Sequence, residues 1–323
     1  MMSPMSTFFC LDLSKAFDKL QHNRLLNYLN TQGLNHGFLR WLHSYLQARP
    51  FRVKILNNFG PPSISHSGVP QGSVLGPYLF AAYMGSFSFD PQNVFTTKYA
   101  DDVTIIEWVY RNTLSSITLS DCTSLFNHGG LFLNESKCKQ LCIRRSQNDF
   151  LLSDTGFSDA DIVKVLGFRI CKNLTWNAQI SEVLKLAARR LYMIRCLKKC
   201  LSSQELIRVY HAVITSLILY ASPAYGRLPT TLLMRLEKFQ NRGHRLICGP
   251  SCECDGFPSL GQRIEDAAVK FLRIAESYHD HPLHNDVPGR LPATNRMRLP
   301  FCNTTRRLNS FFPWAARVAN SKF

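Results

Sequence analysis

The chain has 323 residues, of which 45% are hydrophobic and 19% charged, a composition that excludes a disordered or fibrous protein and allows a buried core. Its formal net charge of +16 indicates a polyanionic partner, with nucleic acid as the first candidate. The 11 cysteines are an odd set without a small secreted scaffold, so we expect reduced thiols and no disulfide framework.

A basic membrane-surface protein would carry the same charge, but the sequence shows no basic amphipathic anchor helix. The longest apolar run, Ala212 to Ala221, is interrupted by Thr215 and Ser216, and we interpret it as a buried helix too short to span a bilayer. Residues 1–7 lack the charged head and apolar centre of a signal peptide. We therefore expect an intracellular protein, in the cytoplasm and/or the nucleus, without membrane association.

The N-terminal part begins with an apolar strand, Phe8 to Asp12, that ends on an aspartate. A turn then leads into an amphipathic helix whose apolar positions are Leu20, Leu25, Leu26 and Leu29. Residues 51–55 alternate apolar and basic side chains, which predicts a half-exposed strand. Gly and Pro punctuate a loop at 68–77, and an apolar helix to about Met84 follows it.

A predicted hairpin over residues 93–106 carries two adjacent carboxylates, Asp101 and Asp102, at its turn. Like charges this close repel and raise each other's pKa unless a cation absorbs the field. Oxygen ligands without His or Cys nearby favour Mg²⁺ or Mn²⁺ over zinc. Taken alone, the pair fits a solvated turn equally well, because Asp is common in turns.

Beyond this hairpin the pattern continues to mix strands and helices. A weak helical periodicity covers 112–131, a short strand is predicted at 139–143, and a second hairpin opens at 162–168 and returns towards Trp176. This order predicts an α+β layer with helices on one face. From about residue 178 the periodicity is helical throughout, with helices predicted over 178–194, 204–221, 231–247 and 262–278.

The helical part carries most of the positive charge. Between Lys185 and Arg245 the only acidic residues are Glu205 and Glu237, which indicates a face that contacts polyanions, although a solvated basic face fits as well. After His279 the sequence is rich in Pro, Asn and Arg, and we expect a loosely structured basic tail. Several possible zinc ligands have a spacing that fits no standard zinc pattern: Cys248, Cys252, Cys254, His279, His281 and His284.

Three segments resemble, in this order, the palm of reverse transcriptases, most closely those of LINE-like (non-LTR) retrotransposons. They are Ala16-Phe17-Asp18, Gly68-Val69-Pro70-Gln71-Gly72-Ser73-Val74-Leu75-Gly76-Pro77 and Tyr99-Ala100-Asp101-Asp102. The resemblance implies an α+β fold: a right-hand polymerase palm, with an antiparallel sheet and helices on one face, followed by an α-helical thumb. We place the palm at 1–176, the thumb at 177–250 and a helical, basic C-terminal tail at 251–323.

The same resemblance implies an RNA-directed DNA polymerase that adds dNTPs to a primer 3′-hydroxyl. Its partners would be an RNA template, a DNA primer and dNTP substrates, and its cofactor Mg²⁺ (or Mn²⁺). By resemblance, Asp12 and Asp101 bridge two metal ions and Asp102 contributes more weakly. Lys137 matches the family lysine that protonates the departing pyrophosphate, although a solvated surface lysine fits equally well. Asp18 lies outside this cluster, and a helix-start acid fits it equally well.

The resemblance also implies four residues that contact substrates. Phe17 matches the aromatic ring beneath the incoming sugar, which excludes a ribose 2′-hydroxyl, although an ordinary core Phe is the alternative. Gln71 matches the glutamine that contacts template and incoming nucleotide, and Gly72 allows close backbone approach. Tyr99 completes the acidic motif and shapes its turn. The segments 165–168 and 174–176 resemble the hairpin that holds the primer end, or are plain core strands.

Family enzymes are longer, and Met1 lies close to Asp12, so we expect an N-terminally truncated copy without fingers or endonuclease domain. A catalytically silent, nucleic-acid-binding remnant of a retrotransposon is therefore the alternative function. An RNA-dependent RNA polymerase or a group II intron maturase is a further alternative, since palms recur across these classes. The bulky Phe17 argues against RNA synthesis, and the hairpin near 165–176 favours the LINE-like branch.

Overall fold

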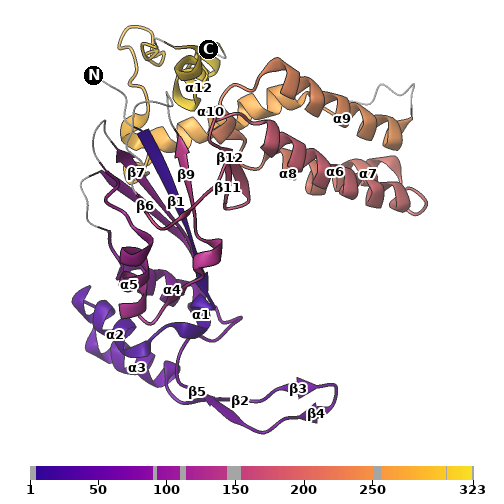
Figure 1. The fold of residues 1–323 in the computed structure, drawn as a ribbon. Helices are drawn as coiled ribbons and strands as arrows, with labels where there is room; N and C mark the ends of the chain where they lie inside the picture. Colours follow the sequence, from indigo (N-terminus) through magenta and orange to yellow (C-terminus); the bar gives the residue numbers. More distant parts are fainter. Residues whose placement is uncertain are drawn as a thin grey trace. The chain divides into compact units, whose positions relative to one another are not determined.

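The computed structural model describes residues 5–89, 93–109, 114–143, 154–249, 256–302 and 304–321. It divides into two compact units, Met1–Leu174 and Thr175–Phe323 (Figure 1). The first unit combines strands and helices, and the second is helical. The limits predicted for thumb and tail within the second unit stay predictions.

The first unit is built around one six-stranded sheet. The strands of the unit, six of which form this sheet, are β1 (Met5–Ser14), β2 (Arg49–Phe51), β3 (Lys54–Ile55), β4 (Asn58–Phe59), β5 (Ser63–Ser65), β6 (Val94–Tyr99), β7 (Asp102–Val109), β8 (Phe132–Leu133), β9 (Lys139–Ile143), β10 (Ser158–Asp159), β11 (Ile162–Val165) and β12 (Phe168–Cys171). Its helices are α1 (Ala16–Lys19), α2 (His22–Thr31), α3 (His36–Leu46), α4 (Leu75–Gly85), α5 (Leu119–His128) and the 3₁₀ helix η1 (Glu135–Lys137). The sheet order is β10-β9-β1-β7-β6, with β8 also paired to β1.

The sheet is antiparallel except at one edge. Strand β1 pairs antiparallel with β7, β8 and β9, and β6 pairs antiparallel with β7. The edge strand β10 runs parallel to β9, a pairing that the sequence did not predict. The reason is that the chain between β9 and β10 is long enough to cross over, which a parallel pair requires.

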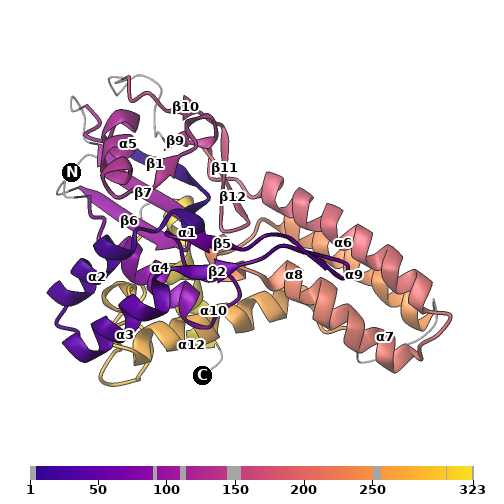
Figure 2. The ribbon, with the colours of Figure 1, turned by 90° about the horizontal axis from the view of Figure 1, so that it is seen from below.

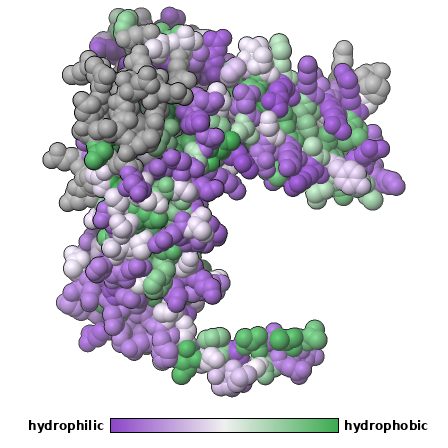
Figure 3. Space-filling model, in the orientation of Figure 1, coloured by the Kyte–Doolittle hydropathy of each residue, from purple (hydrophilic) through white to green (hydrophobic). Residues whose placement is uncertain are grey.

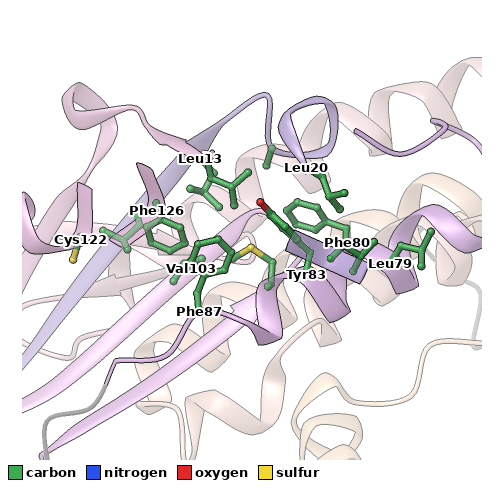
Figure 4. Close-up of a cluster of buried hydrophobic side chains, with 14 of the residues drawn as sticks. Leu13, Leu20, Leu79, Phe80, Tyr83, Phe87, Val103, Cys122 and Phe126 are labelled. Carbon is green, nitrogen blue, oxygen red and sulfur yellow. The ribbon is translucent and has the colours of Figure 1, made fainter. Parts of the chain in front are cut away.

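Side-chain alternation along β1 and β7 explains why helices cover one face. Phe9, Leu11 and Leu13 of β1 and Val103 and Ile105 of β7 are buried, whereas the residues between them in β1 are less so. The buried face packs against apolar residues of the helices, several of which Figure 4 shows: Leu79, Phe80, Tyr83, Cys122 and Phe126. The predicted α+β layer with helices on one face is confirmed.

A narrow β arm, here defined as residues 49–65, extends from this unit (Figure 1). The strand predicted over 51–55 is split in the structure, because β2 pairs with β5 and β3 pairs with β4 in separate two-stranded sheets. Its side chains are mostly exposed, including apolar ones at Phe51, Ile55 and Phe59 (Figure 3).

The second unit consists of helices in the predicted order. They are α6 (Asn177–Leu197), α7 (Ser203–Tyr210), the π-helix η2 (His211–Thr215), α8 (Ser216–Leu219), the 3₁₀ helix η3 (Ser222–Tyr225), α9 (Thr230–Cys248), α10 (Leu260–Ser277), the 3₁₀ helix η4 (His284–Asp286), α11 (Thr305–Leu308) and α12 (Phe311–Ser321). Helices α6, α7 and α9 contact one another and lie side by side in Figures 1 and 2. A capping box between Ser202 and Glu205 begins α7, which satisfies the orphan N–H groups of its first turn.

One helical run in the described residues, Ser203–Tyr225, is long and apolar enough by length and composition to cross a membrane. The buried helix predicted at Ala212 to Ala221 is part of this longer helical run. Leu206, Tyr210, Ile214 and Ile218 recur every fourth residue and are buried. Since α7 and α8 also contact α6, this stripe is that of a core helix of the second unit.

The C-terminal region is more ordered than the expected loose tail. Helix α12 packs against α10 and buries Trp314, Ala315 and Ala316. The sequence did not predict this helix, because its apolar face spans only 11 residues and follows a basic, Pro-rich segment. Part of the predicted tail is therefore folded core.

Candidate active site

The register of the central strands brings two of the predicted carboxylates together. Asp12 of β1 is the direct antiparallel partner of Asp102 of β7. Because Leu11, Leu13 and Val103 point into the helix-covered core, Asp12 and Asp102 project from the opposite face of the sheet. Directly opposed residues on one face have Cβ atoms about 4.5–5.5 Å apart. The sheet therefore presents two carboxylates from separate strands at one place.

The hairpin turn adds a third carboxylate. Tyr99 pairs with Asp102, so Ala100 and Asp101 form the two-residue connection between β6 and β7. Ala100 has φ +53°, a left-handed conformation that costs a non-glycine residue about 1 kcal/mol. The Tyr99 side chain is 69% exposed and lies at the strand end, as a residue that borders the turn would. The turn thus keeps Asp101 beside Asp102 at the cost of local backbone strain.

The three carboxylates interact electrostatically. Burial raises the pKa of the Asp102 carboxyl above its ordinary value, and the nearby charges of Asp101 and Asp12 raise it further. Lys164 of β11 opposes this shift in the pKa. Sequence reasoning did not identify Lys164, because it is an ordinary polar position in an alternating strand and only the fold brings it within reach of Asp102. The site carries an excess of negative charge that a cation would relieve.

Lys137 lies beside this cluster, as the resemblance implied. Its Nζ is 3.4 Å from Oδ2 of Asp12, with the two side chains 65% and 41% exposed. The backbone N–H of Asn134 donates to the carbonyl of Asp12 at 2.8 Å, which ties the segment before Lys137 to β1. An ion pair this exposed contributes about 0–1 kcal/mol, so the ammonium can leave Asp12 readily. Its predicted role in proton transfer stays a prediction.

The donor set suits a hard divalent cation. Asp12, Asp101 and Asp102 supply only oxygen ligands, as Mg²⁺ and Mn²⁺ prefer. The pKa of Asp102 is raised first by burial and then by the charges of Asp101 and Asp12, which such an ion would neutralise. Within the described ranges, however, no three His, Cys, Asp or Glu side chains are already arranged to hold a metal ion. Side-chain rotation would be needed, starting with release of Asp12 from Lys137. Of the weighed zinc ligands, Cys252 and Cys254 lie outside the described residues.

Phe17 connects the first acidic strand to the glycine-rich loop. It lies in α1, is half-buried, and stacks on Phe80 of α4 with ring centroids 4.2 Å apart. The Val69 N–H donates to the Phe17 carbonyl at 3.0 Å. The ring therefore has both a core contact and a partly accessible face, so its predicted contact with the incoming sugar stays a prediction.

Gln71 has a partner that the sequence did not reveal. Its Nε2 donates to Oδ1 of Asp18 at 2.9 Å, and the Ser67 hydroxyl donates to the Asp18 carbonyl at 2.9 Å. Asp18 thus positions the loop that carries Gln71. No spacing rule predicts a contact between side chains so far apart in sequence. The predicted contact of Gln71 with template and nucleotide stays a prediction.

The glycines of this loop differ in what surrounds them. Gly68 has φ +74°, and a Cβ built there would lie 2.7 Å from both the Asp18 Cα and the Phe17 carbonyl oxygen. Gly72 has φ +80°, but a Cβ there would meet no atom within 4 Å. Position 68 therefore requires glycine both for its left-handed backbone conformation and for lack of space, whereas position 72 requires it only for the conformation.

We expect Gly68→Ala to lower the free energy of unfolding by about 2–4 kcal/mol, since a strained φ and a clash with rigid backbone add together. Gly72→Ala is the matched control, with an expected cost of about 1 kcal/mol from its φ alone. Urea denaturation of both variants measures the difference. Equal costs for the two substitutions would contradict the close approach of the loop to α1.

Residues 3–170 match the family model described as reverse transcriptase (RNA-dependent DNA polymerase). The chain is 24% identical to the RNA-directed DNA polymerase from mobile element jockey of Drosophila funebris, over 94% of this chain and 35% of the relative. It is 25% identical to the probable RNA-directed DNA polymerase from transposon X-element of Drosophila melanogaster, over 93% of this chain and 34% of the relative.

Among solved structures, one similar chain is that of telomerase from Candida tropicalis in complex with a TWJ fragment of telomeric RNA. The alignment covers 88% of this chain and 48% of the telomerase chain. The identity is 12% and the TM-score 0.40, too low to establish a common fold. The chain spans about a third of the length of the two mobile-element relatives. Because the family model matches more than half of the chain, the chain belongs to the reverse transcriptase (RNA-dependent DNA polymerase) family, in its LINE-like branch.

Proposed function

We propose that this chain carries RNA-directed DNA polymerase activity and adds dNTPs to the 3′-hydroxyl of a DNA primer on an RNA template. The observation that carries the proposal is the pairing of Asp12 with Asp102 across β1 and β7, with Asp101 adjacent in the turn. Carboxylates that converge from separate strands are what a two-metal nucleotidyl transfer requires. The family membership and the names of the two relatives support the same reaction.

Asp12, Asp101 and Asp102 would hold divalent ions, proposed as Mg²⁺ or Mn²⁺. When bound, such ions lower the pKa of the attacking hydroxyl and neutralise charge on the leaving oxygen. Lys137 lies at the edge of the same cluster, where its ammonium, 3.4 Å from Asp12, can turn to a departing pyrophosphate and donate a proton. Asp18 would act as a positioning residue, because its carboxylate holds the amide of Gln71.

We expect Phe17→Ala to raise ribonucleotide incorporation relative to deoxyribonucleotide incorporation by about tenfold or more, since a removed steric wall is worth 1–3 kcal/mol of discrimination. Steady-state kcat/KM with dATP and ATP on one primer measures the ratio. Phe17→Tyr, which keeps the bulk of the ring, is the control and should leave the ratio unchanged. If Phe17→Ala lowers both rates equally, the ring is only a core contact of Phe80.

The second unit supports contact with a nucleic-acid duplex. Four basic residues of α9, here called the α9 stripe, are exposed and recur at spacings of three and four residues: Arg235, Lys238, Arg242 and Arg245. This spacing places them on one face of the helix, and Leu232, Leu236 and Ile247 bury the other face. A row of cations along a helix suits the phosphates of a template–primer backbone.

The first test is primer extension by the purified chain on poly(rA)/oligo(dT) with Mg²⁺ or Mn²⁺. Metal-dependent dTTP incorporation supports the polymerase. The alternative is a catalytically silent nucleic-acid-binding remnant, motivated by the expected loss of the fingers and by the net charge of +16. Hybrid binding that falls with salt, without any incorporation by folded protein, would replace the polymerase with that alternative.

A further inference from the structure

A polar cavity of about 340 Å³ lies in the first unit, apart from the three carboxylates. Its lining residues come from the start of α2, the end of α3 and the segment after β5: Gln21, His22, Asn23, His43, Gln47, Ala48, His66 and Ser67. We call it the histidine cavity. Among these lining residues there are three imidazoles, three carboxamides and a hydroxyl, and no carboxylate.

The wall of the cavity is anchored to the glycine-rich loop. His22 Nε2 lies 2.8 Å from the Gly68 carbonyl, and Arg49 Nη2 donates to the same oxygen at 3.0 Å. One carbonyl therefore holds a buried imidazole and a guanidinium beside each other. Arg49 is not one of the lining residues, but its guanidinium, which stays protonated at any physiological pH, places a fixed positive charge beside the Gly68 carbonyl that holds this wall.

The charges that face His22 from the surrounding elements are mostly positive. Burial lowers the pKa of His22, its bond to the Gly68 carbonyl raises it, and Arg49 of β2, His43 of α3 and His66 after β5 lower it. Asp18 is the nearby carboxylate, but it accepts from Gln71 instead. Helix α2 also begins at this wall, and no side chain caps its first N–H groups. These N–H groups therefore add a partial positive charge beside the cavity.

The lining side chains and the positive charges near them favour an anionic ligand. Three histidines suggest a metal, yet no described group of three such side chains is arranged to hold one. Imidazole, carboxamide and hydroxyl groups in the lining, without a carboxylate among them and with the Arg49 guanidinium on the neighbouring Gly68 carbonyl, match the donors that bind a phosphoryl oxyanion.

We propose that the histidine cavity is a phosphate-binding site, distinct from the proposed nucleotidyl-transfer site, that takes a phosphoryl group of a nucleic-acid backbone or of a free phosphate. His43, His66 and Gln47 contact the anion, and Arg49 supplies long-range attraction. Because His22 and Arg49 hold Gly68, the bound anion lies behind the loop that carries Gln71. The proposal does not depend on polymerase activity.

The test follows the imidazole Cε1–H resonances of the whole chain by NMR, during titration with inorganic phosphate and, separately, with an eight-nucleotide RNA. We expect saturable shifts of His43 and His66.

Two variants and a control make the result specific. His43→Gln with His66→Gln should weaken binding about tenfold, and Gln47→Glu, which adds a negative charge at an exposed position, should abolish it. The matched control removes two histidines of the second unit, His279→Gln with His284→Gln, and should bind as the unchanged chain does.

The two titrations distinguish the sources of the phosphoryl group. Shifts with RNA that a methylphosphonate RNA of the same sequence does not produce identify a nucleic-acid backbone. Shifts with inorganic phosphate alone identify a free anion. The proposal is overturned if neither probe moves His43 or His66, or if folded Gln47→Glu protein binds as tightly as the unchanged chain.

Discussion

Joint replacement of Asp101 and Asp102 by Asn should reduce metal-dependent dNTP incorporation by at least about 100-fold, since metal ions at the reacting oxygens supply several kcal/mol of transition-state stabilisation. The amide side chain keeps the size of the carboxylate but loses the charge that a divalent ion needs. Asp12 faces Asp102 directly and is the one carboxylate of the three that this variant keeps. Primer extension at saturating hybrid concentration measures the loss.

Stability measurements separate this effect from unfolding. Removal of like charges on opposed strands should stabilise the metal-free protein, by about 0.2–1 kcal/mol. The raised pKa of Asp102 sets the sign of the pH dependence. A carboxyl whose pKa is higher in the folded state favours folding when it is protonated. The free energy of unfolding of the unchanged chain should therefore rise relative to that of the variant as the pH falls towards the carboxyl range. A folded variant with undiminished incorporation would remove the carboxylates from the mechanism.

Replacement of the whole α9 stripe by alanine should weaken binding of an RNA–DNA hybrid on the order of 100-fold at 0.1 M salt. Each phosphate contact contributes about 0.9 to the slope of log affinity against log salt, so loss of all four should flatten this slope by about 3.6. Arg235 also donates to Ser181 of α6 at 3.1 Å, on an exposed surface where little stability is at stake. Fluorescence anisotropy over a range of salt concentrations measures both quantities.

A second quadruple variant controls for net charge. Lys270, Arg273, Arg296 and Arg298 are also exposed basic residues of the second unit, and their replacement by alanine removes the same charge. If the two variants lose affinity and slope equally, binding follows the overall charge of the chain and not the face of α9. A larger loss for the α9 stripe assigns the duplex contact to that helix.

The elements themselves could be predicted from local sequence. Alternation around Phe9 and Leu11 predicted β1, and the turn at Asp101 predicted the β6–β7 hairpin, because these patterns depend on neighbours in the chain. Helices α6, α9 and α10 were predicted within a few residues for the same reason. The prediction failed where the local signal is weak, as for α12, whose short apolar face follows a basic and Pro-rich segment.

Sequence by itself determined the chemistry available to this protein: the three carboxylates, the bulky Phe17, the glycines of the loop and a basic helical half. Tertiary structure alone decided which of these groups meet. The pairing of Asp12 with Asp102 depends on strand register, and the contacts of Lys137 with Asp12 and of Gln71 with Asp18 join residues far apart in the chain. Such contacts result from packing of the whole core, which no local pattern of residues encodes.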